Sequence, residues 1–289
     1  MGGWTIGIIG GSGLYDVAGI EDGEWVSVDS PWGAPSDQCF VGRVGHARVV
    51  FLPRHGRGHR IPPSELNARA NIDVLKRLGV TDVLAVSSVG SLVEDRPPGS
   101  FTVADQFIDR TKGRPSSFFG TGMVAHVSMA DPVCPRLSQL AAEAARAAGA
   151  SVHEAGTYLA MEGPQFSSRA ESHLYRSWGC HIIGMTAMPE AKLAREAELP
   201  YALVGMVTDY DCWREGEEAV DVAQVIAQLS ANAEKARAMV MHLLRNLPEE
   251  RPASPIDTCL DTALITAPHA RDPELLARLD AVAGRALGA

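Results

Sequence analysis

Runs of apolar residues without polar alternation recur along this chain and predict buried β-strands. Five runs have this character, at residues 6–9, 49–52, 83–86, 181–185 and 201–207. A strand that is apolar on both faces is typical of a sheet covered by helices on each side.

Segments with helical periodicity lie between several of these runs. They are residues 64–78, 136–148, 189–198 and a helix opened by the capping-box sequence Ser168-Arg169-Ala170-Glu171. A longer amphipathic helix has apolar residues at helical spacing, namely Val222, Val225, Ile226, Leu229, Ala233, Ala236, Val240 and Leu243. Strands that alternate with helices predict an α/β fold, here a single domain whose central mixed, largely parallel β-sheet is flanked by helices.

The chain changes character near Pro248. The segment "PEERPASPIDT" is rich in proline, and a short helical pattern follows at residues 273–287. We therefore expect one domain at residues 1–248. Residues 249–289 are expected to form a C-terminal appendage that packs at a subunit interface.

Composition narrows the class of protein. The hydrophobic fraction of 46% and the charged fraction of 21% are ordinary for a globular protein. The formal net charge of −9 disfavours nucleic acid and anionic membranes as partners. Neither an 18-residue apolar run nor a signal-peptide pattern is visible, so we expect a cytoplasmic protein. Five widely spaced cysteines predict reduced thiols and neither a zinc site nor a disulfide framework.

The glycines of "TIGIIGGSGLYD" follow the first predicted strand. Gly11 and Gly13 fit the first two positions of a dinucleotide-binding fingerprint, but Asp16 stands where the third glycine belongs. A carboxylate there would repel a pyrophosphate, which disfavours a nicotinamide oxidoreductase. Two interpretations stay open: an ordinary β-turn, or a turn whose N–H groups and Ser12 hydroxyl hold one small anion.

Polar residues follow three further predicted strands. "PRHGRGHR" is the only dense basic cluster and includes Arg54 and His55, "SSVGS" includes Ser87, Ser88 and Gly90, and Thr186 follows the fourth run. Arginine recognises oxyanions bidentately, and hydroxyl groups fill the remaining oxygens. Singly, these features are a surface turn or a helix cap. Together, at the carboxyl ends of strands in one sheet, they predict one oxyanion site.

Two carboxylates follow the last predicted strand in "VTDYDCW". Asp209 and Asp211 are two residues apart, which places both on one side of an extended strand. They could coordinate a metal, act as an acid/base pair, accept hydrogen bonds from a heterocyclic base, or simply cap a turn. No third ligand at suitable spacing supports a metal. Phe166 and Met185 are candidates to cover a flat ligand, with core packing as the ordinary alternative.

Several motifs in combination resemble one known family. They are "IGIIGGSGL", "RHGRGH", "LNARANI", "GSL", "DQFIDRT", "EGPQFSSRAES", "GMTAMPEAKLARE" and "TDYDCW". The sequence is similar to the trimeric purine nucleoside phosphorylase superfamily and, within it, to the 5′-methylthioadenosine phosphorylases. The resemblance spans about residues 6–247 and implies their α/β fold, a homotrimer, inorganic phosphate as a co-substrate, and no metal or organic cofactor.

The resemblance implies a role for each matching residue. The phosphate-binding residues would be Ser12, Arg54, His55, Ser87, Ser88 and Thr186. Phe166, Met185 and the backbone up to Gly90 would line the ribose and base. Asp209 would face N7 and Asp211 the 6-amino group, while His126 would reach the neighbouring subunit's pocket. Val222, Val225 and Ile226 could supply an apolar pocket for a methylthio group.

The implied reaction is phosphorolysis of a nucleoside. Departure of the purine is helped by a protonated Asp209, which requires a raised pKa, as expected beside a second carboxylate in a dry pocket. Related 6-oxopurine enzymes carry asparagine at this position, so the pair of aspartates favours adenine. One departure is Gly184, which replaces an asparagine of animal members. A broader or 6-oxopurine nucleoside phosphorylase and a catalytically silent nucleoside-binding protein are the alternatives.

Overall fold

The computed structural model describes residues 3–11, 14, 19–214 and 222–288, with only the backbone given for residues 222–227. The described strands are β1 Thr5–Gly10, β2 Glu21–Val26, β3 Cys39–Val44, β4 Ala47–Pro53, β5 Asp82–Ser91, β6 Phe101–Ala104, β7 Gln106–Asp109, β8 Val152–His153, β9 Thr157–Ala160, β10 Ile182–Gly184 and β11 Tyr201–Asp209. The helices are α1 Ala68–Arg77, α2 Pro135–Ala147, α3 Arg169–Ser177, α4 Ala187–Glu196, α5 Val222–Arg245, α6 Pro273–Arg278 and α7 Asp280–Leu287. Short 3₁₀ turns lie at Pro63–Glu65, Pro255–Thr258 and Pro268–Ala270.

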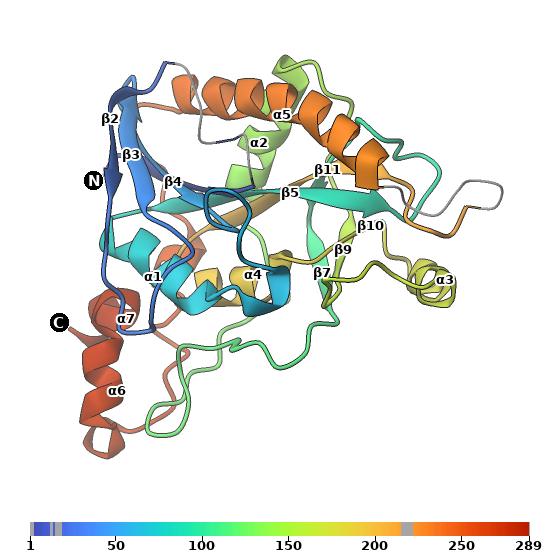
Figure 1. Ribbon diagram of the computed structural model, residues 1–289. Helices are drawn as coiled ribbons and strands as arrows, with labels where there is room; N and C mark the ends of the chain where they lie inside the picture. Colours follow the sequence, from blue (N-terminus) through green and yellow to red (C-terminus); the bar gives the residue numbers. More distant parts are fainter. Residues whose placement is uncertain (1–2, 12–13, 15–18, 215–221, 289) are drawn as a thin grey trace.

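All described strands join one mixed sheet that branches at β5 (Figure 1). Strands β4, β1, β5 and β11 lie side by side in parallel and bring their carboxyl ends to one edge. Strands β10, β9 and β7 are parallel to one another, but β10 runs antiparallel to β5. The β2–β3–β4 meander and β6 add antiparallel pairs. The predicted mixed, largely parallel α/β sheet is thus confirmed.

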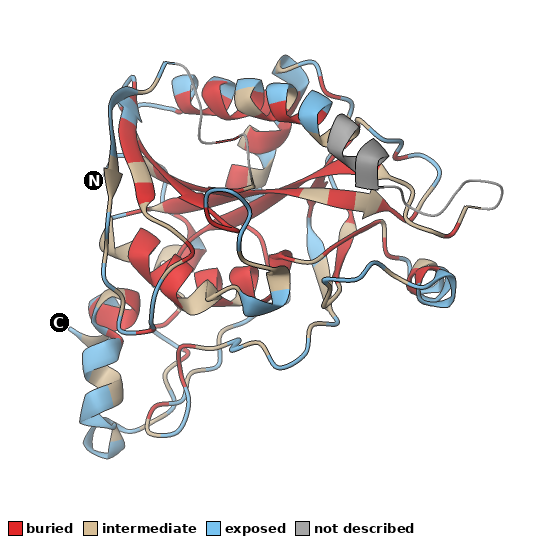
Figure 2. Ribbon diagram, in the orientation of Figure 1, coloured by how far each residue is buried: buried red, intermediate tan, exposed pale blue. Residues whose placement is uncertain are grey.

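The sheet separates two apolar layers. Helices α1 and α4 cover one face, and α2 and α5 cover the other (Figure 1). Successive side chains of β1 enter opposite layers: Ile9 belongs to the same apolar cluster as Ile72 of α1, whereas Ile8 belongs to the same cluster as Leu137 of α2. Buried strands therefore lie between helices whose outer faces are exposed (Figure 2). This explains why the strand sequences show no polar alternation.

Four of the five predicted strands fall within an observed strand, the fifth, at residues 181–185, contains the shorter β10, and the capping box at the start of α3 is present. The Ser168 hydroxyl accepts a hydrogen bond from the Glu171 N–H, and the Glu171 carboxylate accepts one from the Ser168 N–H. Strands β2, β3 and β6–β9 were not anticipated. Most of these are two to four residues long or, like the exposed β2, lack an apolar run.

The C-terminal segment packs back onto its own chain. Helix α7 contacts α1, and Leu279, Val282 and Ala283 belong to the same apolar layer as Ile72. Packing of this segment at a subunit interface stays a prediction. The five cysteines are unpaired. Within the described part of the chain, every helix is too short or too polar to cross a membrane.

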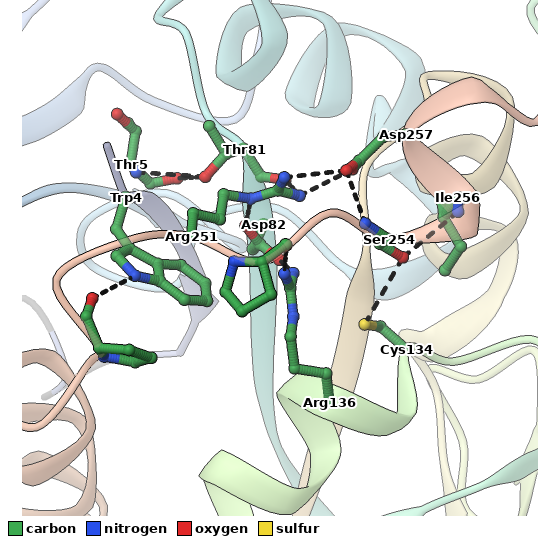
Figure 3. A network of polar contacts seen from close by, with 12 residues as sticks. Trp4, Thr5, Thr81, Asp82, Cys134, Arg136, Arg251, Ser254, Ile256 and Asp257 are labelled. Carbon is green, nitrogen blue, oxygen red and sulfur yellow. Dashed lines mark hydrogen bonds and ion pairs between the residues drawn. The ribbon is translucent and has the colours of Figure 1, made fainter. Parts of the chain in front are cut away.

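A buried carboxylate joins this C-terminal segment to the amino end of the sheet. Asp82, at the start of β5, is fully buried and accepts hydrogen bonds from Arg136 of α2 and from Arg251 Nε, the latter at 2.5 Å (Figure 3). Arg251 also donates to Asp257 at 2.7 Å and to the Thr81 carbonyl at 3.1 Å. The network lies at the end of β5 opposite to Ser91 and ties three distant segments together.

We predict that Arg251→Ala lowers the free energy of unfolding by about 2–3 kcal/mol, because it leaves the buried Asp82 with one cationic partner instead of two. Chemical denaturation at fixed protein concentration measures the change. The control is Arg146→Ala, which removes an exposed ion pair with Glu154 and should cost about 0–1 kcal/mol. Equal midpoints for Arg251→Ala and wild type would contradict the structural role of the network.

Candidate active site

A cavity of about 330 Å³ opens where the parallel strands end, which is the expected place for a site in an α/β sheet. Ten of the predicted site residues line it: Arg54, His55, Ser87, Ser88, Gly90, Phe166, Met185, Thr186, Asp209 and Asp211. Ser12 lies outside the described residues, as do the side chains of Val222, Val225 and Ile226. His126 is exposed, its N–H donates to the Ala263 carbonyl, and it is not among the described lining residues.

The segment "SSVGS" lies inside β5 and not, as predicted, after the end of that strand. Strand β5 continues to Ser91 because it pairs with β11 as far as Gly90 and with β10 at Gly90 and Ser91. Gly90 stands beside Asp209 in this register, and a Cβ there would lie 3.0 Å from Asp209 Oδ1. Glycine at this position therefore leaves room for the carboxyl group.

Arg54 follows β4 and is the most buried cation of the site, with 2% of its surface exposed. Its Nε and Nη2 contact the two carboxylate oxygens of Glu190 at 3.0 and 3.1 Å. Nη1 donates to the Val86 carbonyl at 2.9 Å, and Nη2 to the Ile9 carbonyl at 3.3 Å. Burial opposes the charge, but the Glu190 carboxylate raises the pKa of the guanidinium. A guanidinium has five N–H groups, so one on Nη1 is left for a ligand.

His55 lies next to Arg54 and is uncharged at neutral pH. Burial lowers the pKa of its imidazole to about 4, and the charges of Arg54 and His59 act in the same direction. Its Nδ1 lies 2.9 Å from the Ile61 carbonyl, and the His59 ring stacks on it with 4.2 Å between centroids. The imidazole is thus held in one orientation at the edge of the cavity.

Two hydroxyl groups complete this polar end of the cavity. Thr186 occupies the N-cap position of α4, but its side chain does not cap the helix. Instead its Oγ1 lies 3.2 Å from Ser87 Oγ, so the two hydroxyls form a pair beside Arg54. Arg54, Ser87 and Thr186 together offer several donors within one concave surface, which suits a tetrahedral oxyanion.

The opposite end of the cavity holds the two aspartates. Asp209 ends β11, and burial raises the pKa of its carboxyl group. Its Oδ2 accepts from Thr208 Oγ1 at 2.7 Å and its Oδ1 from the Asp211 N–H at 2.8 Å. The raised pKa was expected, and of the two predicted causes the dry pocket is the one responsible, because burial and not the charge of the second carboxylate raises it.

Asp211 is placed by a tight turn and not by strand alternation. Its φ of +53° lies in the left-handed region, two residues after the end of the hydrogen-bonded strand. Burial raises the pKa of Asp211, and the charge of Asp209 raises it further. Oδ2 of Asp211 is buried and makes no hydrogen bond to any described residue, which leaves it available as an acceptor. Within the described residues, no group of three or more His, Cys, Asp or Glu side chains is placed to hold a metal ion.

Phe166 and Met185 flank the aspartates. Half of the Phe166 surface is exposed, which a core side chain would not show, so its ring is free to cover a flat ligand. Arg114 positions the backbone beside both residues. It donates to the Met185 carbonyl at 2.7 Å and to the Glu162 carbonyl at 2.5 Å.

Sequence reasoning missed four residues that build the site. They are Glu190, Tyr201, Thr208 and Arg114. Glu190 is 136 positions from its partner Arg54, and no local pattern links them. A glutamate inside the apolar stretch of α4, 4% exposed, was the only available signal, since buried carboxylates are almost always paired.

Comparison with known proteins agrees with this geometry. Residues 5–245 match the model of the phosphorylase superfamily. The chain is 60% identical to S-methyl-5′-thioadenosine phosphorylase of Cereibacter sphaeroides, with 98% of each chain covered. It superimposes on a methylthioadenosine phosphorylase from an antarctic soil metagenomic library, with a TM-score of 0.92, 46% identity, and 98% and 99% of the two chains covered.

A more distant structure carries a ligand. An adenosine/methylthioadenosine phosphorylase mutant of Schistosoma mansoni in complex with methylthioadenosine is 39% identical, with a TM-score of 0.77 over 83% of this chain and 90% of that one. Such identity over nearly full length shows common family membership. The chain belongs to the phosphorylase superfamily and, within it, to the S-methyl-5′-thioadenosine phosphorylase family.

Proposed function

We propose that this enzyme cleaves S-methyl-5′-thioadenosine with inorganic phosphate, giving adenine and 5-methylthioribose 1-phosphate. The observation that carries the proposal is one cavity with an oxyanion-binding end at Arg54 and, at the other end, Asp209, a carboxyl group whose pKa is raised by burial. The relatives' names supply the substrate class. Phosphate is a co-substrate, and no metal or organic cofactor enters the proposed reaction.

The polar end of the cavity would hold phosphate. The free Arg54 N–H and the hydroxyls of Ser87, Ser88 and Thr186 would donate to its oxygens, together with Ser12. The nucleophile would then lie beyond the carboxyl end of β4 and beside Ser87 and Ser88 of β5, on one side of the bound ribose. A fixed nucleophile removes much of the entropic cost of a reaction between two substrates.

The other end would hold adenine between Phe166 and Met185. Asp211 Oδ2, which is buried and has no hydrogen-bond partner among the described residues, would accept a hydrogen bond from the 6-amino group. A 6-oxo purine presents an acceptor there instead, so the two acceptors would oppose each other. Asp209, whose pKa is raised by burial, would in its protonated form donate a proton to N7.

In the proposed reaction the C1′–N9 bond breaks and its electron pair passes to the purine. A phosphate oxygen forms the new bond to C1′, and the Asp209 proton goes to N7. Hydrogen phosphate loses one proton overall when it becomes the sugar phosphate dianion, and this proton restores Asp209. Protonation of the leaving group by a positioned acid is typically worth ~10²–10⁴-fold in rate.

A phosphate-dependence assay tests the function. Methylthioadenosine, adenosine and inosine are each incubated with and without inorganic phosphate, and release of the free base is measured. We expect adenine from methylthioadenosine only when phosphate is present. Preferential cleavage of inosine would favour a 6-oxopurine nucleoside phosphorylase, and no cleavage of any of the three would contradict the proposal.

We predict that Asp209→Asn lowers kcat/KM for methylthioadenosine by about 100-fold or more and relatively improves inosine cleavage, since an amide cannot protonate N7. In wild type, kcat/KM should fall as pH rises through the raised pKa of Asp209, because the acid form is lost. The variant should lack this alkaline limb.

Asp211→Asn is the matched control for Asp209→Asn. It changes the partner of the 6-amino group but keeps the acid at N7, so the alkaline limb should persist while KM rises. An Asp209→Asn enzyme that keeps the wild-type ratio of inosine to methylthioadenosine cleavage would refute the role given to Asp209.

We also propose a cytoplasmic homotrimer in which His126 reaches a neighbour's cavity near the 5′ substituent, beside Val222, Val225 and Ile226. This rests on family resemblance and on the exposure of His126.

His126→Ala should raise KM for methylthioadenosine about 5-fold, the cost of one lost contact, without changing the trimeric mass measured by light scattering. The control is the exposed His46→Ala. A monomeric wild type, or an unchanged KM, would contradict this arrangement.

A further inference from the structure

The direction of one hydrogen bond fixes the proton position on His55. Nδ1 of the imidazole lies 2.9 Å from the Ile61 carbonyl oxygen. A carbonyl oxygen can only accept, so the proton must be on Nδ1. The nitrogen left for a ligand in the cavity is therefore Nε2, on the other side of the ring.

Nε2 is an acceptor and not a donor at neutral pH. Burial lowers the pKa of the imidazole to about 4, and the charged groups that face it reinforce this. Arg54 is the neighbouring cation, and His59 stacks on the ring. A neutral imidazole that carries its proton on Nδ1 presents a lone pair at Nε2.

The site also carries little net charge. Electrostatic attraction to a bound anion therefore does little to compensate for a poorly matched hydrogen bond. The Arg54 guanidinium is paired with Glu190 through two contacts of 3.0 and 3.1 Å, both groups being almost fully buried. An anion beside them is therefore held mainly by matched donors and acceptors. A buried acceptor that faces another acceptor is costly, because neither is satisfied.

We infer that His55 Nε2 accepts a hydrogen bond from the bound oxyanion, so that the site selects oxyanions that carry a proton over those that carry none. Hydrogen phosphate and hydrogen arsenate each have one O–H group. Sulfate has none, and neither has fluorophosphate, which matches hydrogen phosphate in charge and shape. The inference deepens the proposed function by naming the residue that distinguishes phosphate from sulfate.

Calorimetric titration of the intact enzyme in mildly alkaline buffer, without nucleoside, tests the inference. The probes are phosphate, arsenate, sulfate and fluorophosphate. Arsenate should bind within about 3-fold of phosphate, whereas sulfate and fluorophosphate should bind about 10-fold more weakly or worse. Binding of either unprotonated anion within 3-fold of phosphate would overturn the inference.

Titration in buffers of different ionisation enthalpy adds a second readout. If His55 is an acceptor, phosphate binds without proton uptake by the protein. Uptake of about one proton for each sulfate bound would mean that the imidazole becomes a cationic donor, which also overturns the inference.

His55→Gln tests the residue, since its amide N–H₂ can donate to an unprotonated oxygen. The difference between phosphate and sulfate should shrink to about 3-fold or less. His46→Gln is the matched control, because it makes the same exchange at an exposed histidine that is not among the described lining residues of the cavity. It should keep the wild-type selectivity. An equal loss of selectivity in both variants would show that the effect does not belong to His55.

The comparison of the four anions in the wild-type enzyme tests the inference without either variant. It is also independent of the nucleoside cleavage assay. An enzyme that binds phosphate selectively but does not cleave methylthioadenosine would contradict the proposed function alone. An enzyme that needs phosphate for cleavage but binds sulfate equally well would contradict only this inference.

Discussion

The buried Arg54–Glu190 pair is the contact on which this site depends. The guanidinium comes from the end of β4 and donates to carbonyls of β1 and β5, at Ile9 and Val86. Glu190 belongs to α4 and also accepts from the Tyr201 hydroxyl of β11 at 2.9 Å. One cation thus fixes the relative positions of four parallel strands and a helix. A charge so deeply buried is tolerated only because every contact is of hydrogen-bond length.

This pairing determines how the cavity handles anions. Glu190 cancels the charge of Arg54, and His55 is neutral. Recognition of an anion therefore relies on the match of hydrogen-bond donors and acceptors more than on electrostatic attraction. The same low-dielectric surroundings raise the pKa of Asp209 at the other end of the cavity. Burial therefore disfavours the charged form of His55 and the charged form of Asp209 within a single cavity. Both shifts suit a reaction that moves one proton while breaking a glycosidic bond.

Much of this arrangement could be predicted from the sequence. Long apolar strands and the capping box of α3 are local patterns, and "RHGRGH" and "TDYD" mark the ends of strands. The remainder depends on contacts between distant residues. The partner of Arg54 is 136 positions away, and β5 extends past its predicted end because β10 and β11 pair with it. Short strands such as β8 exist only through their neighbours. The roles of Ser12 and of the residues opening α5 rest on resemblance alone.

Gly184 shows how a departure from the family pattern can be accommodated. The residue precedes Met185 and Thr186, and a Cβ built on it would collide with the Tyr158 hydroxyl. Tyr158 is fully buried on β9, paired in register with Ile182, and its hydroxyl lies 3.5 Å from the Thr186 N–H. The space that an asparagine side chain would need is therefore filled by a polar group from the adjacent strand. Because the Tyr158 hydroxyl contacts the Thr186 N–H, glycine at position 184 leaves a polar contact to the backbone at the oxyanion end of the cavity. Gly184 and Tyr158 are thus coupled, because a side chain at position 184 requires the Tyr158 hydroxyl to move or to be absent.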